Sequence, residues 1–432
     1  MKDTFFKSTI ILLLGGAIVK FLGMFIKIIM NRIIGIEAMS LYMLVFPTFT
    51  LGLTISQIGI PSAIIKLVSE NTHNNKKIMQ SIIPISIIYN LLIFTIFILL
   101  SKIIAYFLND TRTIIPIISI AFTLPFDSIS NILRSYYYGK EKMFIATLSL
   151  LVEQLVRLSL IVFLIPSILD KGIEITVSSL ILINIISELS SIILLITLIK
   201  NKNISLKDFK IDKKEIKSIM RIALPTTGSR LIGGIAYFLE PIIITTLLLK
   251  NGYSKDYIIE EYGIIEGYVL PILLLPSFLT NALSCIIIPD ISKKYGKKEF
   301  NNIKKRIRQV IKITLFIGIT SLTIIYINKN ILLELLYETN KGSNYIKILI
   351  PFFILHYLET SLESILQAID KAKTIMKNNI IGITSKILIL IILSYLNIGL
   401  YNLIIAIIIN INITTILHIN AIKKELAKLH IV

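Results

Sequence analysis

Long apolar stretches alternate with short polar segments along the whole chain. Each stretch has about 20 residues or more, which is enough to cross a hydrocarbon core of about 30 Å at a rise of 1.5 Å per residue. The pattern predicts an all-α, polytopic membrane protein with about twelve transmembrane helices, at residues 8–31, 41–68, 79–108, 114–138, 144–168, 175–199, 218–249, 262–289, 309–328, 345–369, 375–396 and 398–420. The last boundary is the least distinct, because only Leu396 and Asn397 separate the two final stretches.

The composition agrees with a membrane protein. Hydrophobic residues make up 55% of the 432 positions, the mean hydropathy is +0.82, and only 16% of the residues are charged. An ordinary soluble domain has about 25% charged residues. The single cysteine, Cys285, excludes an internal disulfide framework.

A net charge of +19 raises the question of a nucleic-acid partner, and the distribution of the charge answers it. With the N-terminus inside, the cytoplasmic segments hold about 30 of the 45 Lys and Arg residues, and the external loops hold about 7. This positive-inside pattern predicts an even number of spans with both termini in the cytoplasm. Anionic membrane lipids are therefore the expected partner of the basic segments, and no nucleic acid is expected.

The sequence predicts that the chain is a diverged repeat of two halves. KFLG at 20–23 matches RLIG at 230–233, and GKEK at 139–142 matches DKAK at 370–373, in the same order. Both halves begin inside, so the repeats are parallel, and such halves enclose a central cavity and rock against each other. The sequence predicts an N-terminal six-helix lobe at 1–200, a cytoplasmic linker at 201–217, and a C-terminal six-helix lobe at 218–432.

Basic residues inside the apolar stretches are candidates for substrate binding. A charge at bilayer depth costs roughly 2.5–3.5 kcal/mol, so it normally faces a watery cavity. Lys20 and Lys27 lie two turns apart on one face of the first span, and Arg230 takes the equivalent place of Lys20 in the seventh. We expect all three to bind an anionic headgroup, with snorkelling to the interface as the alternative for Lys27.

Other intramembrane charges have partners at helical spacing. Glu153 and Arg157 are four residues apart, the spacing of an intrahelical ion pair. Asp127 and Arg134, seven apart in the fourth span, are expected to join the same network. These four residues are predicted to form an ion-pair network that allows the charges to exist within the membrane.

A third group of intramembrane charges consists of two carboxylates, which carry the same charge. Glu359 and Glu363 are four residues apart in the tenth span. Adjacent carboxylates raise each other's pKa, so either one of them is protonated or both face a coupling cation.

The sequence contains no catalytic constellation. His73, His356, His418 and His430 are scattered without the spacing of a metal site, and neither a P-loop nor a nucleotide-binding glycine motif is present. We therefore expect no metal, no cofactor and no enzymatic activity.

Three stretches together resemble a known family. LRSYYYGKEKMFIATLSLLVEQLVR at 133–157 resembles a signature of polysaccharide exporters in the multidrug, oligosaccharidyl-lipid and polysaccharide flippase superfamily, and specifically of the stage V sporulation protein B family. Residues 35–70 and 224–244 agree with it. The resemblance implies two six-helix lobes and a flippase for lipid-linked sugars, such as peptidoglycan or spore-cortex precursors. Basic cavity residues of related lipid II flippases are associated with pyrophosphate recognition, which is the role implied for Lys20, Lys27 and Arg230.

One feature departs from this family. Its members usually have fourteen spans, whereas about twelve are predicted here, and the extra pair helps lipid II flippases to hold the polyprenyl tail. The expected activity is translocation of a polyprenyl-pyrophosphate oligosaccharide or peptidoglycan precursor by alternating access. A cation-coupled multidrug exporter of the same fold is the alternative, although the first span offers lysines where such a protein favours a carboxylate. A membrane glycosyltransferase or polymerase would need converging catalytic acids, which the short external loops do not supply.

Overall fold

The computed structural model describes residues 2–70, 75–198, 212–297 and 299–428, and within these ranges it contains helices and no strand. Residues pack into two compact units, Met1–Ile242 and Ile243–Val432. The division falls within a long helix, α7. Most of the predicted linker at 201–217 lies outside the described residues, so the six-plus-six lobe boundaries stay a prediction.

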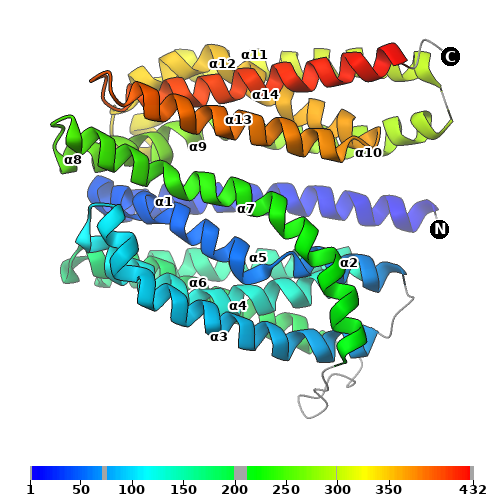
Figure 1. The fold of residues 1–432 in the computed structure, drawn as a ribbon, viewed down its shortest axis with the longest axis horizontal. Helices are drawn as coiled ribbons and strands as arrows, with labels where there is room; N and C mark the ends of the chain where they lie inside the picture. Colours follow the sequence, from blue (N-terminus) through cyan, green and yellow to red (C-terminus); the bar gives the residue numbers. More distant parts are fainter. Residues whose placement is uncertain (1, 71–74, 199–211, 298, 429–432) are drawn as a thin grey trace. The chain divides into compact units, whose positions relative to one another are not determined.

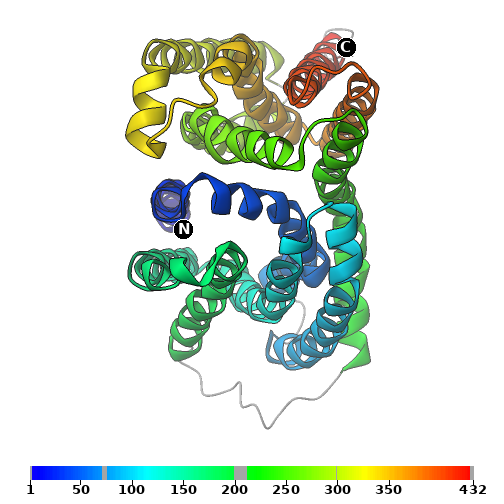
Figure 2. The ribbon, with the colours of Figure 1, turned by 90° about the vertical axis from the view of Figure 1, so that its left-hand side faces the viewer.

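The first unit is a bundle of long helices (Figure 1). In chain order they are α1 (Lys2–Gln57), α2 (Ile60–Glu70), α3 (Asn75–Phe107), α4 (Ile114–Gly139), α5 (Met143–Leu164), α6 (Ile173–Thr197) and the larger part of α7 (Lys213–Lys250). Figure 2 looks along these helices and shows α1, α4, α5 and α6 as neighbours. Their polar side chains meet between the helices, whereas many of their apolar side chains point outward.

Helix α1 contains two membrane passes. Gly35 lies inside it with φ +73° and ψ −179°, which is not a helical conformation and favours glycine because no Cβ is present. Arg112, in the turn before α4, contacts Glu37 just after this break at 3.2 Å and also binds Asp110 at 2.8 Å. The break therefore lies at the same end of the bundle as the α3–α4 turn. Because the chain turns at Gly35 without leaving the helix for more than one residue, α1 covers both the first predicted span and most of the second.

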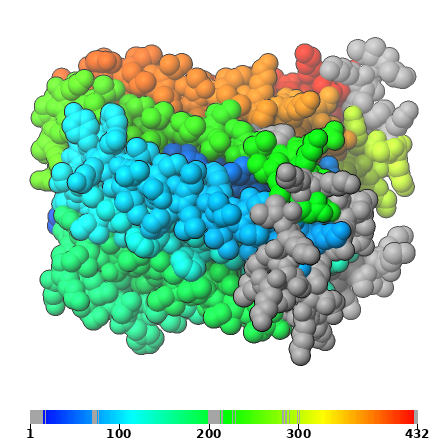
Figure 3. Space-filling model, turned by 60° about the horizontal axis from the view of Figure 1, so that its bottom comes forward, coloured from blue at the N-terminus to red at the C-terminus, as the bar shows by residue number. Residues whose placement is uncertain are grey.

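Apolar side chains that face away from the bundle identify the lipid-facing surface. Helix α3 forms a large part of the face in Figure 3, and many of its aliphatic side chains are exposed. Leu99 is 71% exposed and Ile88 is 63% exposed, values that a soluble protein avoids for so many neighbouring residues. These side chains are accommodated when the surrounding solvent is hydrocarbon.

The second unit begins with an interrupted helix. It consists of α8 (Lys255–Ile264), a π-helical turn (Ile265–Val269), α9 (Leu270–Leu274) and α10 (Ser277–Gly296). The span predicted at 262–289 is therefore made of several helical pieces rather than one regular helix. Pro271 and Pro276 stand at the starts of α9 and α10, where a proline lacks the N–H group that would continue the preceding helix.

Four longer helices complete the second unit: α11 (Phe300–Tyr337), α12 (Ser343–Ala368), α13 (Ala372–Leu393) and α14 (Tyr401–Lys428). Helices α12, α13 and α14 lie side by side (Figures 1 and 2). Gly382 of α13 allows a close approach to α14, because a Cβ on it would lie 2.1 Å from Thr414 Oγ1. Small residues at such crossings are typical of helix packing in membranes.

The prediction of an all-α, polytopic membrane protein is confirmed. Ten helices among the described residues are long and apolar enough to cross a bilayer. One of them, Ile18–Gln57, includes the break at Gly35 and therefore makes two passes, and the interrupted segment α8–α10 accounts for one more. The structure thus agrees with about twelve spans.

Candidate functional site

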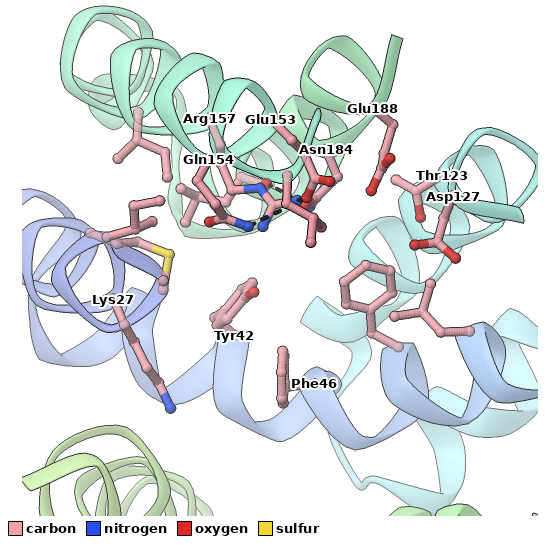
Figure 4. A pocket seen from close by; sticks show the side chains of 18 of the residues that line it. Lys27, Tyr42, Phe46, Thr123, Asp127, Glu153, Gln154, Arg157, Asn184 and Glu188 are labelled. Carbon is pink, nitrogen blue, oxygen red and sulfur yellow. Dashed lines mark hydrogen bonds and ion pairs between the residues drawn. The ribbon is translucent and has the colours of Figure 1, made fainter. Parts of the chain in front are cut away.

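A cavity of about 430 Å³ lies within the first unit, between α1, α4, α5 and α6. Its aliphatic and aromatic wall comes mainly from α1, and most of its polar wall comes from the other three helices (Figure 4). The lining residues that carry charges or amides are Lys27, Asp127, Asn131, Arg134, Glu153, Gln154, Arg157, Asn184 and Glu188. A cavity of this size falls in the range of small-ligand pockets.

Arg134 connects three helices at one end of this cavity. Its guanidinium donates to Glu153 of α5 at 2.8 Å, and it lies 3.8 Å from the carboxylate of Glu188 on α6. It also donates to Ser130 and to Ser191, at 3.0 and 3.1 Å. All three charged side chains are almost completely buried, so the arginine supplies the counter-charge that allows two carboxylates to remain inside the bundle.

Glu153 is shared by two arginines. Its second carboxylate oxygen accepts from Arg157, one helical turn further along α5, at 2.8 Å. The neighbouring Gln154 points its amide toward the same carboxylate at 3.4 Å. The Nε of Arg157 and the Oε1 of Gln154 are buried and have no hydrogen-bond partner within the described chain. This side of the cavity therefore offers one donor and one acceptor to a ligand.

Asp127 of α4 extends the polar wall. Its Oδ2 accepts a hydrogen bond of 2.8 Å from Gln57, near the end of α1, so a neutral amide is its direct partner. Figure 4 shows its carboxylate and that of Glu188 on the same side of the cavity, away from Arg157. The wall is thus more acidic toward α4 and α6 and more basic toward α1 and α5.

The opposite wall is aromatic and carries one lysine. Tyr42 and Phe46 of α1 face the Glu153–Arg157 pair across the cavity, and the Lys27 ammonium lies 6.0 Å from the centre of the Phe46 ring (Figure 4). Three carboxylates and three cationic side chains line the cavity, so its charge is close to balanced. Such a site can hydrogen-bond a polar headgroup while an aromatic ring packs against it.

The three predicted headgroup-binding residues are not all in this cavity. Lys27 lines it, whereas Lys20 and Arg230 do not. Lys20 is exposed on α1, two turns before Lys27, and Arg230 is exposed on the first-unit part of α7. Their role in headgroup binding stays a prediction.

The two predicted coupling-ion carboxylates lie in the second unit. Glu359 and Glu363 are on α12, and the structure brings His418 of α14 to them. His356, one turn before Glu359, lies 3.5 Å from its carboxylate. The sequence spacing did not indicate a group of this kind, because 55 residues separate Glu363 from His418.

Several cavity residues were missed from sequence. Glu188 has no opposite charge at helical spacing in its own span, and its proximity to Arg134 depends on how α4 packs against α6. Gln154, Asn184 and Tyr42 gave no signal, because polar and aromatic residues occur throughout the apolar stretches.

Comparison with known proteins identifies the family. The pattern of the family described as polysaccharide biosynthesis protein matches residues 5–295, which is more than half of the chain. The chain belongs to the polysaccharide biosynthesis protein family. A second pattern, that of the MatE family, matches residues 265–396.

Two relatives from Bacillus subtilis (strain 168) align with most of the present chain. Stage V sporulation protein B is 32% identical to it over 98% of this chain and 85% of the relative. The lipid II flippase MurJ is 21% identical over 90% of this chain and 77% of the relative. The sequence-based assignment to the stage V sporulation protein B family is therefore confirmed.

Solved structures give the same fold. An inward-facing multidrug resistance MATE family transporter of the MOP superfamily aligns with a TM-score of 0.78 at 15% identity, covering 95% of each chain. An outward-facing structure of such a transporter aligns with a TM-score of 0.64, covering 99% of this chain and 97% of the other. Sequence family and fold together place the protein in the multidrug, oligosaccharidyl-lipid and polysaccharide flippase superfamily.

Proposed function

We propose that this protein is a flippase that carries a lipid-linked sugar across the bacterial cytoplasmic membrane. Its substrate is a polyprenyl-pyrophosphate oligosaccharide or peptidoglycan precursor, with spore-cortex or cell-wall synthesis as the purpose. Family membership supports the reaction class, and the similarity to a lipid II flippase supports the substrate class. The protein moves the headgroup without changing its covalent bonds and needs no cofactor.

The polar cavity between α1 and α4–α6 is the observation that carries this proposal. A sugar headgroup cannot enter hydrocarbon unless its hydroxyl and phosphate groups find partners. The cavity offers the unpaired Arg157 Nε and Gln154 Oε1, together with the aromatic wall of Tyr42 and Phe46. Its charges are balanced within the chain, so it suits a sugar better than it suits a bare cation.

Lysines on α1 supply the positive charge for the pyrophosphate. Lys27 lines the cavity, and Lys20 continues the same helix face toward the first residues of the chain. Arg230 on α7 adds a guanidinium, which can make paired bonds to phosphate oxygens. In this proposal both chain termini lie in the cytoplasm, and the basic residues receive the headgroup from the inner leaflet.

Reconstitution into proteoliposomes tests the proposal. Translocation of a fluorescent lipid II analogue should occur with the intact protein, and it should slow at least tenfold in Lys27→Ala and in the double variant Lys20→Ala with Arg230→Ala. Lys102→Ala is the matched control, because Lys102 is an exposed lysine of α3 outside the cavity. An unchanged rate both in Lys27→Ala and in the double variant would show that the cationic mechanism is wrong.

The multidrug alternative predicts a different outcome of the same assay. An exporter of the MATE type would expel a cationic dye when a sodium or proton gradient is imposed, and it would leave the lipid II analogue in place. Dye export without headgroup translocation would replace the flippase assignment.

A further inference from the structure

Two carboxylates and an imidazole converge in the second unit, outside the cavity of the first. Glu359 and Glu363 come from α12 and His418 comes from α14, and one ligand atom of each lies within 4.8 Å of the others. His418 is completely buried, whereas both carboxylates retain some exposure. The group therefore has a fixed, dry side at α14 and a side that an ion from solution can reach.

The charge of this group is not balanced by strong bases. Within the described part of the chain, neither carboxylate is paired with a lysine or an arginine, and both lie at 3.5 Å from imidazole nitrogens, those of His356 and His418. Two carboxylates inside an apolar helix bundle need a compensating positive charge. Within the described residues no guanidinium or ammonium group provides it, so the group has capacity for an added cation.

The surroundings of His418 orient the ring as a ligand. The side-chain amide nitrogen of Asn378, on α13, lies 2.9 Å from its Nδ1, and the other ring nitrogen, Nε2, lies 3.5 Å from Glu363 Oε1. A half-turn of this amide presents its carbonyl oxygen to Nδ1–H and leaves the Nε2 lone pair free. Histidines that bind metals are commonly held in this way by a hydrogen bond to the second ring nitrogen.

A further oxygen is available next to the carboxylates. Asn379 donates its amide to Glu363 Oε1 at 2.7 Å, while its own Oδ1 is buried and has no hydrogen-bond partner within the described chain. A buried amide oxygen without a partner is costly, and rotation of this side chain would turn it toward a cation held by Glu363. The structure thus holds an unused oxygen donor beside the three ligand atoms.

We propose that Glu359, Glu363 and His418 bind one first-row divalent cation of the Zn²⁺ class. Imidazole suits such ions and carboxylates add the matching charge, whereas alkali ions would not use the imidazole nitrogen. Zn–N and Zn–O bonds of about 2.0–2.2 Å place tetrahedral ligands roughly 3.4 Å apart, so a small rotation of the partly exposed glutamates closes the site. The ion ties α12 to α14 and neutralises the two carboxylates.

Binding of Co²⁺ and Zn²⁺ to the purified full-length protein in detergent tests this site. Co²⁺ gives visible d–d absorption bands, and Zn²⁺ should displace it at one ion per chain. The affinity for either ion should fall at least tenfold in Glu363→Gln and in His418→Gln. Saturating Zn²⁺ should also raise the thermal unfolding temperature of the intact protein and have no such effect on these variants.

Two further variants keep the test decisive. Glu334→Gln changes an exposed glutamate of α11 outside the group and should leave affinity unchanged. Glu359→Gln tests a partly exposed ligand if the buried His418→Gln protein fails to fold. No saturable divalent binding, binding of Na⁺ alone, or equal affinity in all variants would overturn the proposal. No lipid-linked substrate is present in the assay, so its outcome is independent of the flippase assignment.

Discussion

The two units differ most where they correspond in position. Helices α4 and α12 end at the matching segments 139–142 and 370–373, and each packs against the last long helix of its half, α6 or α14. In the first unit, Arg134 and Arg157 neutralise the carboxylates around them. In the second, Glu359 and Glu363 meet imidazoles and amides. The first arrangement is completed by the chain itself, whereas the second has capacity for an added ion.

The sequence predicts that the two units are diverged repeats, and this difference is the kind that would let such repeats take on separate tasks. A buried ion-pair network fixes the helices around a cavity without external help. A carboxylate pair without a lysine or arginine partner among the described residues can instead take up a cation from solution, as proposed above. Variants that exchange or remove these features should therefore have unequal effects in the two units.

The largest effect is expected from Arg134→Met. It leaves Glu153 and Glu188 buried without the guanidinium that joins α4, α5 and α6, and breaking a buried pair in this way costs about 3–5 kcal/mol. Thermal unfolding in detergent, followed by circular dichroism, should show a large loss of stability. Adding Glu188→Gln to this variant should restore part of the loss, because Glu188 is the carboxylate left without an arginine among the described residues, whereas Glu153 keeps Arg157.

Lys102→Met is the control for this comparison, since it removes an exposed cation of α3. If Arg134→Met were no more destabilising than Lys102→Met, the network would not be what holds the three helices of the first unit.

An intermediate effect is expected from Gly382→Ala in the second unit. The added Cβ would lie 2.1 Å from Thr414 Oγ1 and 2.7 Å from Asn410 Oδ1, so α13 and α14 must move apart, at a cost of about 1–3 kcal/mol. Because Asn378 and His418 meet across the same contact, divalent binding should weaken together with stability. The readouts are the unfolding temperature and the Co²⁺ titration.

Gly296→Ala provides the matched control, because a Cβ there meets nothing within 4 Å. A Gly382→Ala protein with the stability and Co²⁺ affinity of this control would contradict the close packing of α13 on α14.

The smallest effects should be nearly equal in the two units. Tyr137 of α4 donates its hydroxyl to the Leu195 carbonyl at 2.7 Å, and Tyr357 of α12 donates to the Leu273 carbonyl at 2.5 Å. Both carbonyls lie in the last turn of a helix, where no N–H of the same helix can pair with them. Tyr137→Phe and Tyr357→Phe should each lower the free energy of unfolding by about 0.5–1.5 kcal/mol. A large difference between the two would show that the repeat does not extend to these contacts.

The sequence predicts the membrane class and the number of spans because hydropathy and length decide both. It predicts the contact of Glu153 with Arg157 because residues four apart share a helix face. The form of the interruption in the eighth predicted span could not be predicted, since prolines in an apolar stretch are compatible with a kinked helix as well as with an interrupted one.

Contacts between helices were beyond the sequence for a physical reason. Arg134 reaches Glu188, and His418 reaches Glu363, because of how α6 and α14 rotate about their own axes. Apolar residues cover these helices on nearly all sides, so no polar stripe indicates the rotation. The same lack of a stripe explains why Lys20 and Arg230 were grouped with Lys27, although Lys27 is the member of the three that lines the cavity.

The break at Gly35 has a mechanical consequence. The cavity residues Gly23–Met30 lie on the pass before it, and Tyr42–Leu53 lie on the pass after it. The helix resumes directly after this glycine, so no flexible loop separates the two segments of α1 that line the cavity. Any change in the angle between them must be taken up by the torsions of one residue, while Arg112 holds the chain beside it at Glu37. Gly35 is in effect a pivot, and replacing it with a residue that resists positive φ would stiffen the cavity without touching its lining.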